Sequence, residues 1–254
     1  MTADGIGLKL WLAFWRYQQW YHRYSVDGLD RLVNSPPALI VGYHGRPAAF
    51  DLCMLTVALY DRLHYLPHGV IHRSVNTVPL LKWFFVDELG FVSTDDESLA
   101  TAVERGEHIL VAPGGVREGC RSFRERYRVA WGDRVGYLRT ALKYNLPIVP
   151  VAAAGADGAY VGLNDAEKLA RFLGVPRDWA WLLWFGVGPL GLFPFSPAFP
   201  VHMHQLVGEP IDLRAERDTS PDDRDGLLRL HHRVTAAVQG LLDRAQGRAS
   251  GRSR

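Results

Sequence analysis

A histidine and an aspartate follow a short apolar run near the start of the chain. His44 ends "PALIVGYH", and Asp51 follows it within "YHGRPAAFD". A histidine with a near-neutral pKa can take a proton from an alcohol while the alcohol attacks a carbonyl. A carboxylate on the other ring nitrogen would fix the tautomer and stabilise the imidazolium. The spacing therefore predicts a catalytic pair in which His44 is the base and Asp51 orients it.

The chain offers no obvious protein nucleophile to accompany this pair. It has no Gly-x-Ser-x-Gly pattern and no cysteine between glycines. A base without a nucleophile suits direct transfer of a group to an acceptor hydroxyl. The structural alternative is a hydrogen-bonded loop histidine beside a helix-capping aspartate, and the pair alone leaves it open.

A second cluster lies in "APGGVREGCRSF" at residues 112–123. Glycines allow backbone N–H groups to approach an anion or a developing oxyanion, and arginines bind phosphate bidentately. A turn explains Pro-Gly-Gly alone, but the added arginines and acid favour a binding role. The predicted substrate-binding residues are Gly114, Gly115, Arg117, Glu118 and Arg121.

Apolar runs alternate with helical segments along the chain. This alternation predicts a single α/β domain whose mostly parallel sheet is flanked by helices. In such sheets the chemistry gathers at the carboxyl ends of the strands, where both clusters would lie. The expected strands are 37–44, 64–69, 90–94, 107–115, 146–155 and 201–213, and the expected helices are 48–63, 77–89, 95–106, 132–145 and 226–245.

Two further segments are apolar enough to suggest contact with lipid. Residues 6–24 combine Trp and Tyr with basic residues, which suits an amphipathic helix at a membrane interface, although a helix docked on the core fits equally. Residues 179–201 hold no charge, but four prolines argue against an unbroken membrane-spanning helix. We interpret 179–201 as an apolar loop that lines a lipid-binding surface or dips into the interface, with burial in the core as the alternative. The expected organisation is an N-terminal aromatic helix at 1–30, the α/β domain at 31–245 and a disordered basic tail at 246–254.

The composition argues against a disordered chain, and it gives no support for a nucleic-acid-binding protein. With 48% hydrophobic and 22% charged residues, the chain is expected to fold. A formal net charge of +2 gives no argument for a nucleic-acid partner. Two cysteines indicate a reducing compartment. His64, His68 and His72 have a spacing that would suit metal ligands on a helix, but Pro67 and Gly69 break that helix, so no metal site is expected. No cofactor is expected either.

Taken together, these motifs resemble those of the glycerolipid acyltransferase superfamily, which includes the glycerol-3-phosphate and lysophosphatidate acyltransferases. The resemblance is strongest to its diacylglycerol-acyltransferase-like branch. It rests on His44 and Asp51, then "ELGFVST" at 88–94, "PGGVRE" at 113–118, "LPIVPVA" at 146–152 and "VGEP" at 207–210, in the family's order. Two departures are a longer gap between His44 and Asp51 and the glycine at 114, where lysophosphatidate enzymes carry glutamate.

The resemblance implies transfer of a fatty acyl group from acyl-CoA or an acyl carrier protein to a lipid hydroxyl. It makes His44 the base and Asp51 its orienting partner, and it assigns the Gly114–Glu118 region to acceptor or phosphate binding. It also implies peripheral or monotopic association with the cytoplasmic face of a membrane. Two alternatives remain, a lipid hydrolase in which water is the acceptor and a non-catalytic lipid-binding protein.

Overall fold

A six-stranded sheet forms the centre of the computed structural model, which describes residues 5–47, 49–71, 75, 77–92, 98–213 and 220–251. The strand order is β1 (Ser25–Asp27), β9 (His204–Val207), β5 (Ile148–Ala154), β2 (Leu39–Gly42), β4 (Ile109–Val111) and β3 (His68–Gly69). Among the strand pairs of this sheet that the structure describes, only β5–β9 is antiparallel. The predicted α/β fold with a mostly parallel sheet is therefore confirmed, with a mixed edge.

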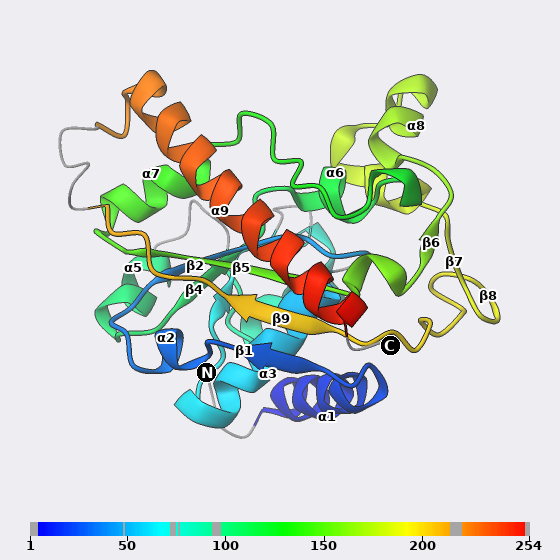
Figure 1. Cartoon of the computed structure of the whole chain (residues 1–254), viewed down its shortest axis with the longest axis horizontal. Helices are drawn as coiled ribbons and strands as arrows, with labels where there is room; N and C mark the ends of the chain where they lie inside the picture. Colours follow the sequence, from blue (N-terminus) through cyan, green and yellow to red (C-terminus); the bar gives the residue numbers. More distant parts are fainter. Residues whose placement is uncertain are drawn as a thin grey trace.

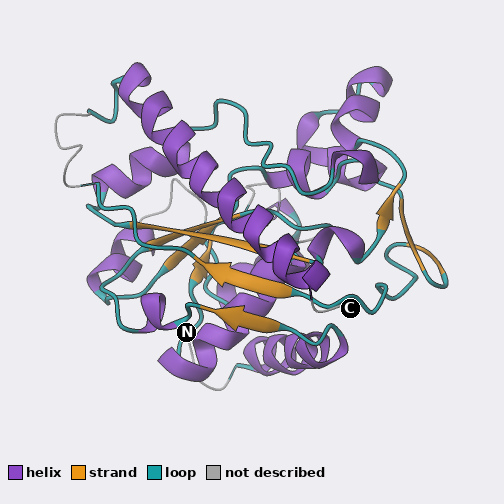
Figure 2. Cartoon of the chain, in the orientation of Figure 1, coloured by secondary structure: helices purple, strands orange, loops and turns teal. Residues whose placement is uncertain are grey.

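Helices cover both faces of this sheet (Figures 1 and 2). α7 (Gly136–Lys143) and α9 (Arg224–Gly251) pack on one face, and α3 (Phe50–Leu63) packs on the other with α2 (Asp30–Val33) beside it. Strand β2 has apolar side chains on both faces of the sheet. Leu39 and Val41 pack with α7 and α9, while Ile40 packs with α2 and α3. Strands buried on both faces read as continuous apolar runs, as β2 and β5 do.

The path of the chain between β5 and β9 explains why β9 runs antiparallel to β5. After β5 the chain stays beyond the carboxyl end of that strand. It forms η4 (Ala156–Gly158), β6 (Val161–Gly162), α8 (Ala166–Leu173), η5 (Arg177–Leu183), β7 (Gly186–Gly188) and β8 (Gly191–Leu192). Figure 1 shows α8 and the small β6–β7–β8 sheet at the right of the molecule. Since no crossover returns the chain to the other end of the sheet, β9 re-enters against the direction of β5.

The remaining elements differ in their bounds from the sequence prediction. The expected helix 77–89 forms as α4 (Pro79–Lys82) and a π-helical turn, η2 (Trp83–Glu88). α5 (Ser98–Glu104) lies within the helix expected at 95–106, while residues 93–97 lie outside the described part of the chain. The strand expected at 90–94 is reduced in the described residues to one bridge between Val92 and Val70. α9 continues through Gly251, so the start of the tail expected to be disordered is helical.

The N-terminal helix α1 (Ile6–Tyr21) docks on the core through one face. Trp11 and Trp15 are buried against α3 and η2, and Trp11 donates its indole N–H to Thr56 Oγ1 at 3.1 Å. Its opposite face is also apolar, and exposed side chains there include Leu10, Phe14 and Trp20. One face of α1 therefore docks on the core, as the alternative interpretation expected. A membrane role for its outer face remains a proposal.

Residues 179–201 form η5, β7, β8 and loops rather than one helix, as the prolines predicted. Within the described ranges, no helix has the length and apolar character needed to cross a bilayer.

Candidate functional site

The carboxyl ends of β2 and β4 are neighbours, and they bring the two predicted clusters together. Val41 of β2 pairs with Val111 of β4, so the chain leaving β2 towards His44 lies beside the chain leaving β4 towards Pro113. The link is direct, because Glu118 Oε2 accepts a hydrogen bond from the His44 backbone N–H at 2.8 Å.

His44 has the protonation pattern of a base. Its Nδ1 lies 3.2 Å from the carbonyl oxygen of Gly45, which can only accept, so Nδ1 carries the hydrogen and Nε2 carries a lone pair. Burial lowers the pKa of the half-buried imidazole, which favours its neutral form.

Asp51 supports His44 indirectly rather than as a hydrogen-bonded partner. No hydrogen bond or ion pair joins the imidazole to the Asp51 carboxylate among the described residues; instead Asp51 Oδ1 accepts from the backbone N–H of Gly45 at 3.2 Å. The predicted direct pair is not formed, because the turn leading into α3 places Asp51 under the Gly45 amide. Burial raises the pKa of this fully buried carboxyl to about 7.

Two glycines allow this packing. A Cβ at Gly45 would lie 2.6 Å from Asp51 Oδ1, and a Cβ at Gly119 would overlap the His44 ring. Gly119 closes α6 (Gly115–Gly119), so this short helix forms a wall against the imidazole. Gly119 was not among the residues predicted from the sequence, although it directly follows the "PGGVRE" motif.

Glu118 is an internal support. Its side chain is fully buried, and Oε1 accepts from the Ala130 backbone N–H at 2.8 Å while Oε2 accepts from Trp131 Nε1 at 3.1 Å as well as from His44. Burial raises its pKa to about 8. These contacts favour a positioning role for Glu118 over its predicted contact with substrate.

Arg121 is also buried, and it forms an internal ion pair. Its guanidinium is buried and pairs with Asp157 Oδ2 at 3.2 Å, while Arg46 Nε lies 3.3 Å from Asp157 Oδ1. Tyr43, which precedes His44, also donates its hydroxyl to Asp157. Asp157 thus anchors residues on both sides of His44, a role that no sequence motif indicated.

The predicted glycines have local structural tasks. Gly115 adopts a φ of +50° and donates its N–H to the Ala112 carbonyl at 3.1 Å. Gly114 packs so tightly against the Glu118 side chain that a Cβ there would overlap it. Their predicted part in binding an oxyanion therefore stays a prediction.

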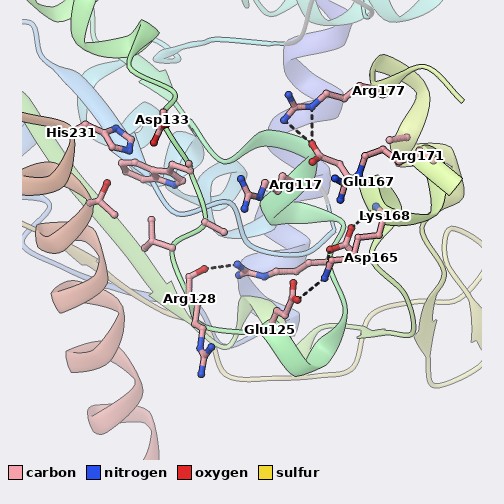
Figure 3. Close-up of a pocket in the computed structure, with 18 of the residues that line it drawn as sticks. Arg117, Glu125, Arg128, Asp133, Asp165, Glu167, Lys168, Arg171, Arg177 and His231 are labelled. Carbon is pink, nitrogen blue, oxygen red and sulfur yellow. Dashed lines mark hydrogen bonds and ion pairs between the residues drawn. The ribbon is translucent and has the colours of Figure 1, made fainter. Parts of the chain in front are cut away.

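Arg117 differs from the other predicted binding residues because its side chain is exposed. It points into a cleft of about 890 Å³ between α6, the 128–133 loop, α8 and α9 (Figure 3). The wall of this cleft includes Ala130 and Trp131, the same residues that Glu118 holds. The cleft and His44 are therefore linked through one buried carboxylate. Within the described residues, no group of three His, Cys, Asp or Glu side chains suits a metal ion.

Residues 23–154 match the family model described as Acyltransferase. The chain belongs to the acyltransferase family. This match contains His44, Asp51 and the Gly114–Arg121 segment.

Relatives of this acyltransferase-family chain come from animals and bacteria. It is 28% identical to the "DGAT1/2-independent enzyme synthesizing storage lipids" of Gallus gallus, over 90% of this chain and 66% of that protein. The human protein of the same name is 25% identical over 89% of this chain and 63% of its own length. An uncharacterized protein of Mycobacterium tuberculosis is 29% identical over 90% and 63%. The chain thus spans just under two thirds of these relatives.

A solved structure supports the same fold. The crystal structure of the 1-acyl-sn-glycerophosphate acyltransferase PlsC from Thermotoga maritima superposes with a TM-score of 0.51 at 15% identity, over 93% of this chain and 78% of that one.

Proposed function

We propose that this protein is a lipid O-acyltransferase that moves a fatty acyl group from a thioester, acyl-CoA or acyl carrier protein, to the hydroxyl of a glycerolipid or related lipid. The observation that carries the proposal is the state of His44, whose Nδ1–H is held by the Gly45 carbonyl. No residue that the structure describes forms a hydrogen bond with Nε2, so its lone pair can accept a proton. Its place within the family's matched residues agrees with this reading.

The reaction follows from that geometry. The acceptor hydroxyl donates its proton to His44 Nε2 as its oxygen attacks the thioester carbonyl. The tetrahedral intermediate collapses, the carbon–sulfur bond breaks, and the imidazolium returns the proton to the departing thiolate. The products are an ester and a free thiol, so no protein nucleophile is needed.

The surrounding residues hold the base in position. Gly45 fixes the tautomer, Asp51 fixes the Gly45 amide, and Glu118 fixes the His44 amide. A preorganised base loses less free energy to reorientation during the reaction.

An apolar surface supplies the proposed contact with a membrane. The outer face of α1 exposes Trp20 by 74%, and the segment around β8 exposes Phe195 by 94% and Leu190 by 82%. The two elements are joined where the Tyr21 hydroxyl donates to the Ala198 carbonyl at 2.8 Å. Because apolar groups of this size are rarely left in water, we infer peripheral binding to the cytoplasmic face of a membrane, where lipid acceptors are found.

The test compares purified wild type with His44→Ala. Each protein receives a labelled long-chain acyl-CoA, or the acyl carrier protein thioester, and a panel of glycerol 3-phosphate, lysophospholipids, mono- and diacylglycerol and long-chain alcohols. Mass spectrometry identifies the products. We expect an ester from wild type and a loss of about 10²–10⁴-fold in His44→Ala, the usual contribution of a general base.

His64→Asn is the matched control. His64 is an exposed residue that caps α3 in a left-handed conformation, which asparagine tolerates, and it lies at the end of α3 remote from Asp51. Full activity of His44→Ala would refute the assignment. Free fatty acid as the only product would favour the hydrolase, and lipid binding without turnover by either protein would favour the binding-protein alternative.

A further inference from the structure

The cleft in Figure 3 carries an excess of positive charge. Six cationic and four acidic side chains line it, and one of the six, Arg121, is paired with the buried Asp157. Lys168 forms ion pairs with two of these acids, Glu125 at 3.0 Å and Asp165 at 3.3 Å. Asp133 lies across the cleft beside His231.

The excess gathers around one carboxylate, Glu167. Glu167 already pairs with Arg177 at 2.9 Å and Arg134 at 3.4 Å. Arg117 from α6 and Arg171 from α8 also lie within electrostatic range of it, yet neither forms an ion pair with any residue that the structure describes. Four arginines thus share a single acid, and two of them are exposed to solvent in the cleft without a counter-charge of their own.

The second observation is the direction of Arg117 relative to His44. Arg117 and Gly119 are two positions apart in α6, so their side-chain directions differ by about 200° around the helix. Gly119 faces the His44 ring, whereas Arg117 faces the cleft. The body of α6 therefore separates the arginines from the reacting atoms.

We propose that this cleft binds the phosphate groups of the coenzyme A portion of the acyl donor, with Arg117 and Arg171 as their ligands. The inference rests on the proposed function and adds which substrate the cleft holds. Arginine is suited to this task because its planar guanidinium binds phosphate oxygens bidentately.

The separation by α6 favours the donor over a phosphorylated acceptor. The phosphate of glycerol 3-phosphate or lysophosphatidate is only a few bonds from the hydroxyl that reacts, whereas a helix with its side chains is about 10 Å across. In coenzyme A the long pantetheine arm lies between the phosphates and the thioester, so the phosphates can occupy the cleft while the acyl carbon lies near His44.

The shape of the site favours a small molecule over a carrier protein. A volume of about 890 Å³ is within the range of small-molecule and cofactor pockets. A carrier protein would instead present a convex surface, and only its phosphopantetheine arm would enter.

The first test is binding, measured without turnover. Titration calorimetry with free coenzyme A compares the wild type with Arg117→Gln and Arg171→Gln. Arg171 is on the exposed side of α8, so its replacement leaves the core intact and keeps the test valid if Arg117→Gln folds poorly. Arg62→Gln is the matched control, because Arg62 is an exposed arginine paired with Asp30 on the surface. We expect affinity to fall about tenfold in each cleft variant, as for loss of one charge-assisted hydrogen bond, and to stay unchanged in Arg62→Gln.

The second test separates donor from acceptor in steady-state kinetics. We expect Arg171→Gln to raise the KM for acyl-CoA and leave the KM for the acceptor unchanged. With an acyl-N-acetylcysteamine thioester, which lacks the phosphates, wild type and Arg171→Gln should react at the same rate.

The outcomes distinguish this inference from the proposed function. Unchanged coenzyme A affinity in both cleft variants overturns the inference, even where His44→Ala abolishes transfer. A raised KM for the acceptor alone also overturns it, and assigns the cleft to the acceptor phosphate. Weakened coenzyme A binding together with full activity of His44→Ala supports the cleft site and removes the proposed role of His44.

Discussion

At the scale of single residues, backbone groups rather than a carboxylate orient His44, the proposed base. The Gly45 carbonyl receives the Nδ1–H of His44, and Asp51 acts one step further away by accepting the Gly45 N–H. This arrangement differs from a triad, in which the carboxylate contacts the imidazole and stabilises its charged form.

The difference predicts the behaviour of Asp51→Asn. An asparagine Oδ1 can still accept from the Gly45 N–H, so we expect kcat/KM to fall by less than about tenfold, whereas a direct partner would cost about 10⁴-fold. Asp51→Ala removes the acceptor and leaves the buried amide unpaired, so its loss should be clearly larger. Acyl transfer by the three proteins is the measurement. Equal and severe loss in Asp51→Asn and Asp51→Ala would show that the charge itself acts on His44.

At the scale of elements, α6 is the wall that fixes the imidazole. Helix α6 is held in turn by Glu118, whose carboxylate accepts hydrogen bonds from His44 after β2 and from Ala130 and Trp131. The position of the His44 ring therefore depends on how closely α6 approaches the carboxyl end of β2.

Gly119→Ala tests this dependence. The added methyl group would overlap the His44 ring and lie 3.0 Å from the Pro47 carbonyl, so the ring or the helix must move. We expect kcat to fall at least about tenfold, with a loss of about 1–3 kcal/mol in the free energy of unfolding from overpacking. Activity assays and urea unfolding measure the two effects.

Gly136→Ala is the control for this substitution. Gly136 begins α7, and among the described residues, apart from its chain neighbours and the backbone of its own helix, no heavy atom lies within 4 Å of the position that its Cβ would take. Alanine should be neutral or slightly stabilising there. Wild-type kcat in Gly119→Ala would contradict the packing of α6 against His44.

At the scale of the whole molecule, the apolar outer surface of α1 and the β8 segment is the proposed membrane-binding face. We expect wild type to co-sediment with vesicles of phosphatidylcholine and phosphatidylglycerol. Replacing Phe14, Trp20, Leu190 and Phe195 together by serine removes several large apolar groups and should weaken partitioning at least about tenfold.

Phe123→Ser provides the control for the vesicle experiment. Phe123 is also exposed, by 38%, but it lies on η3 (Phe123–Glu125) rather than on α1 or the β8 segment. Its replacement should leave partitioning unchanged. Equal sedimentation of the quadruple variant and wild type would remove these two elements from the proposed membrane surface.

The sequence by itself determined the fold class and the two strand ends that make the site. Continuous apolar runs such as "LIV" at 39–41 and "IVPV" at 148–151 require burial on both faces, and parallel strands then bring their carboxyl ends to one edge. His44 and the segment from Gly114 to Arg121 followed directly from that rule.

Only the tertiary structure decided what each of these side chains does. Sequence spacing does not show whether a polar side chain faces solvent or a buried partner, because that depends on residues distant in the chain. Arg121 pairs with Asp157, 36 positions away in the chain. Glu118 accepts a hydrogen bond from the backbone N–H of His44, 74 positions away. Arg117 remains in the cleft because the His44 ring occupies the opposite side of its short helix.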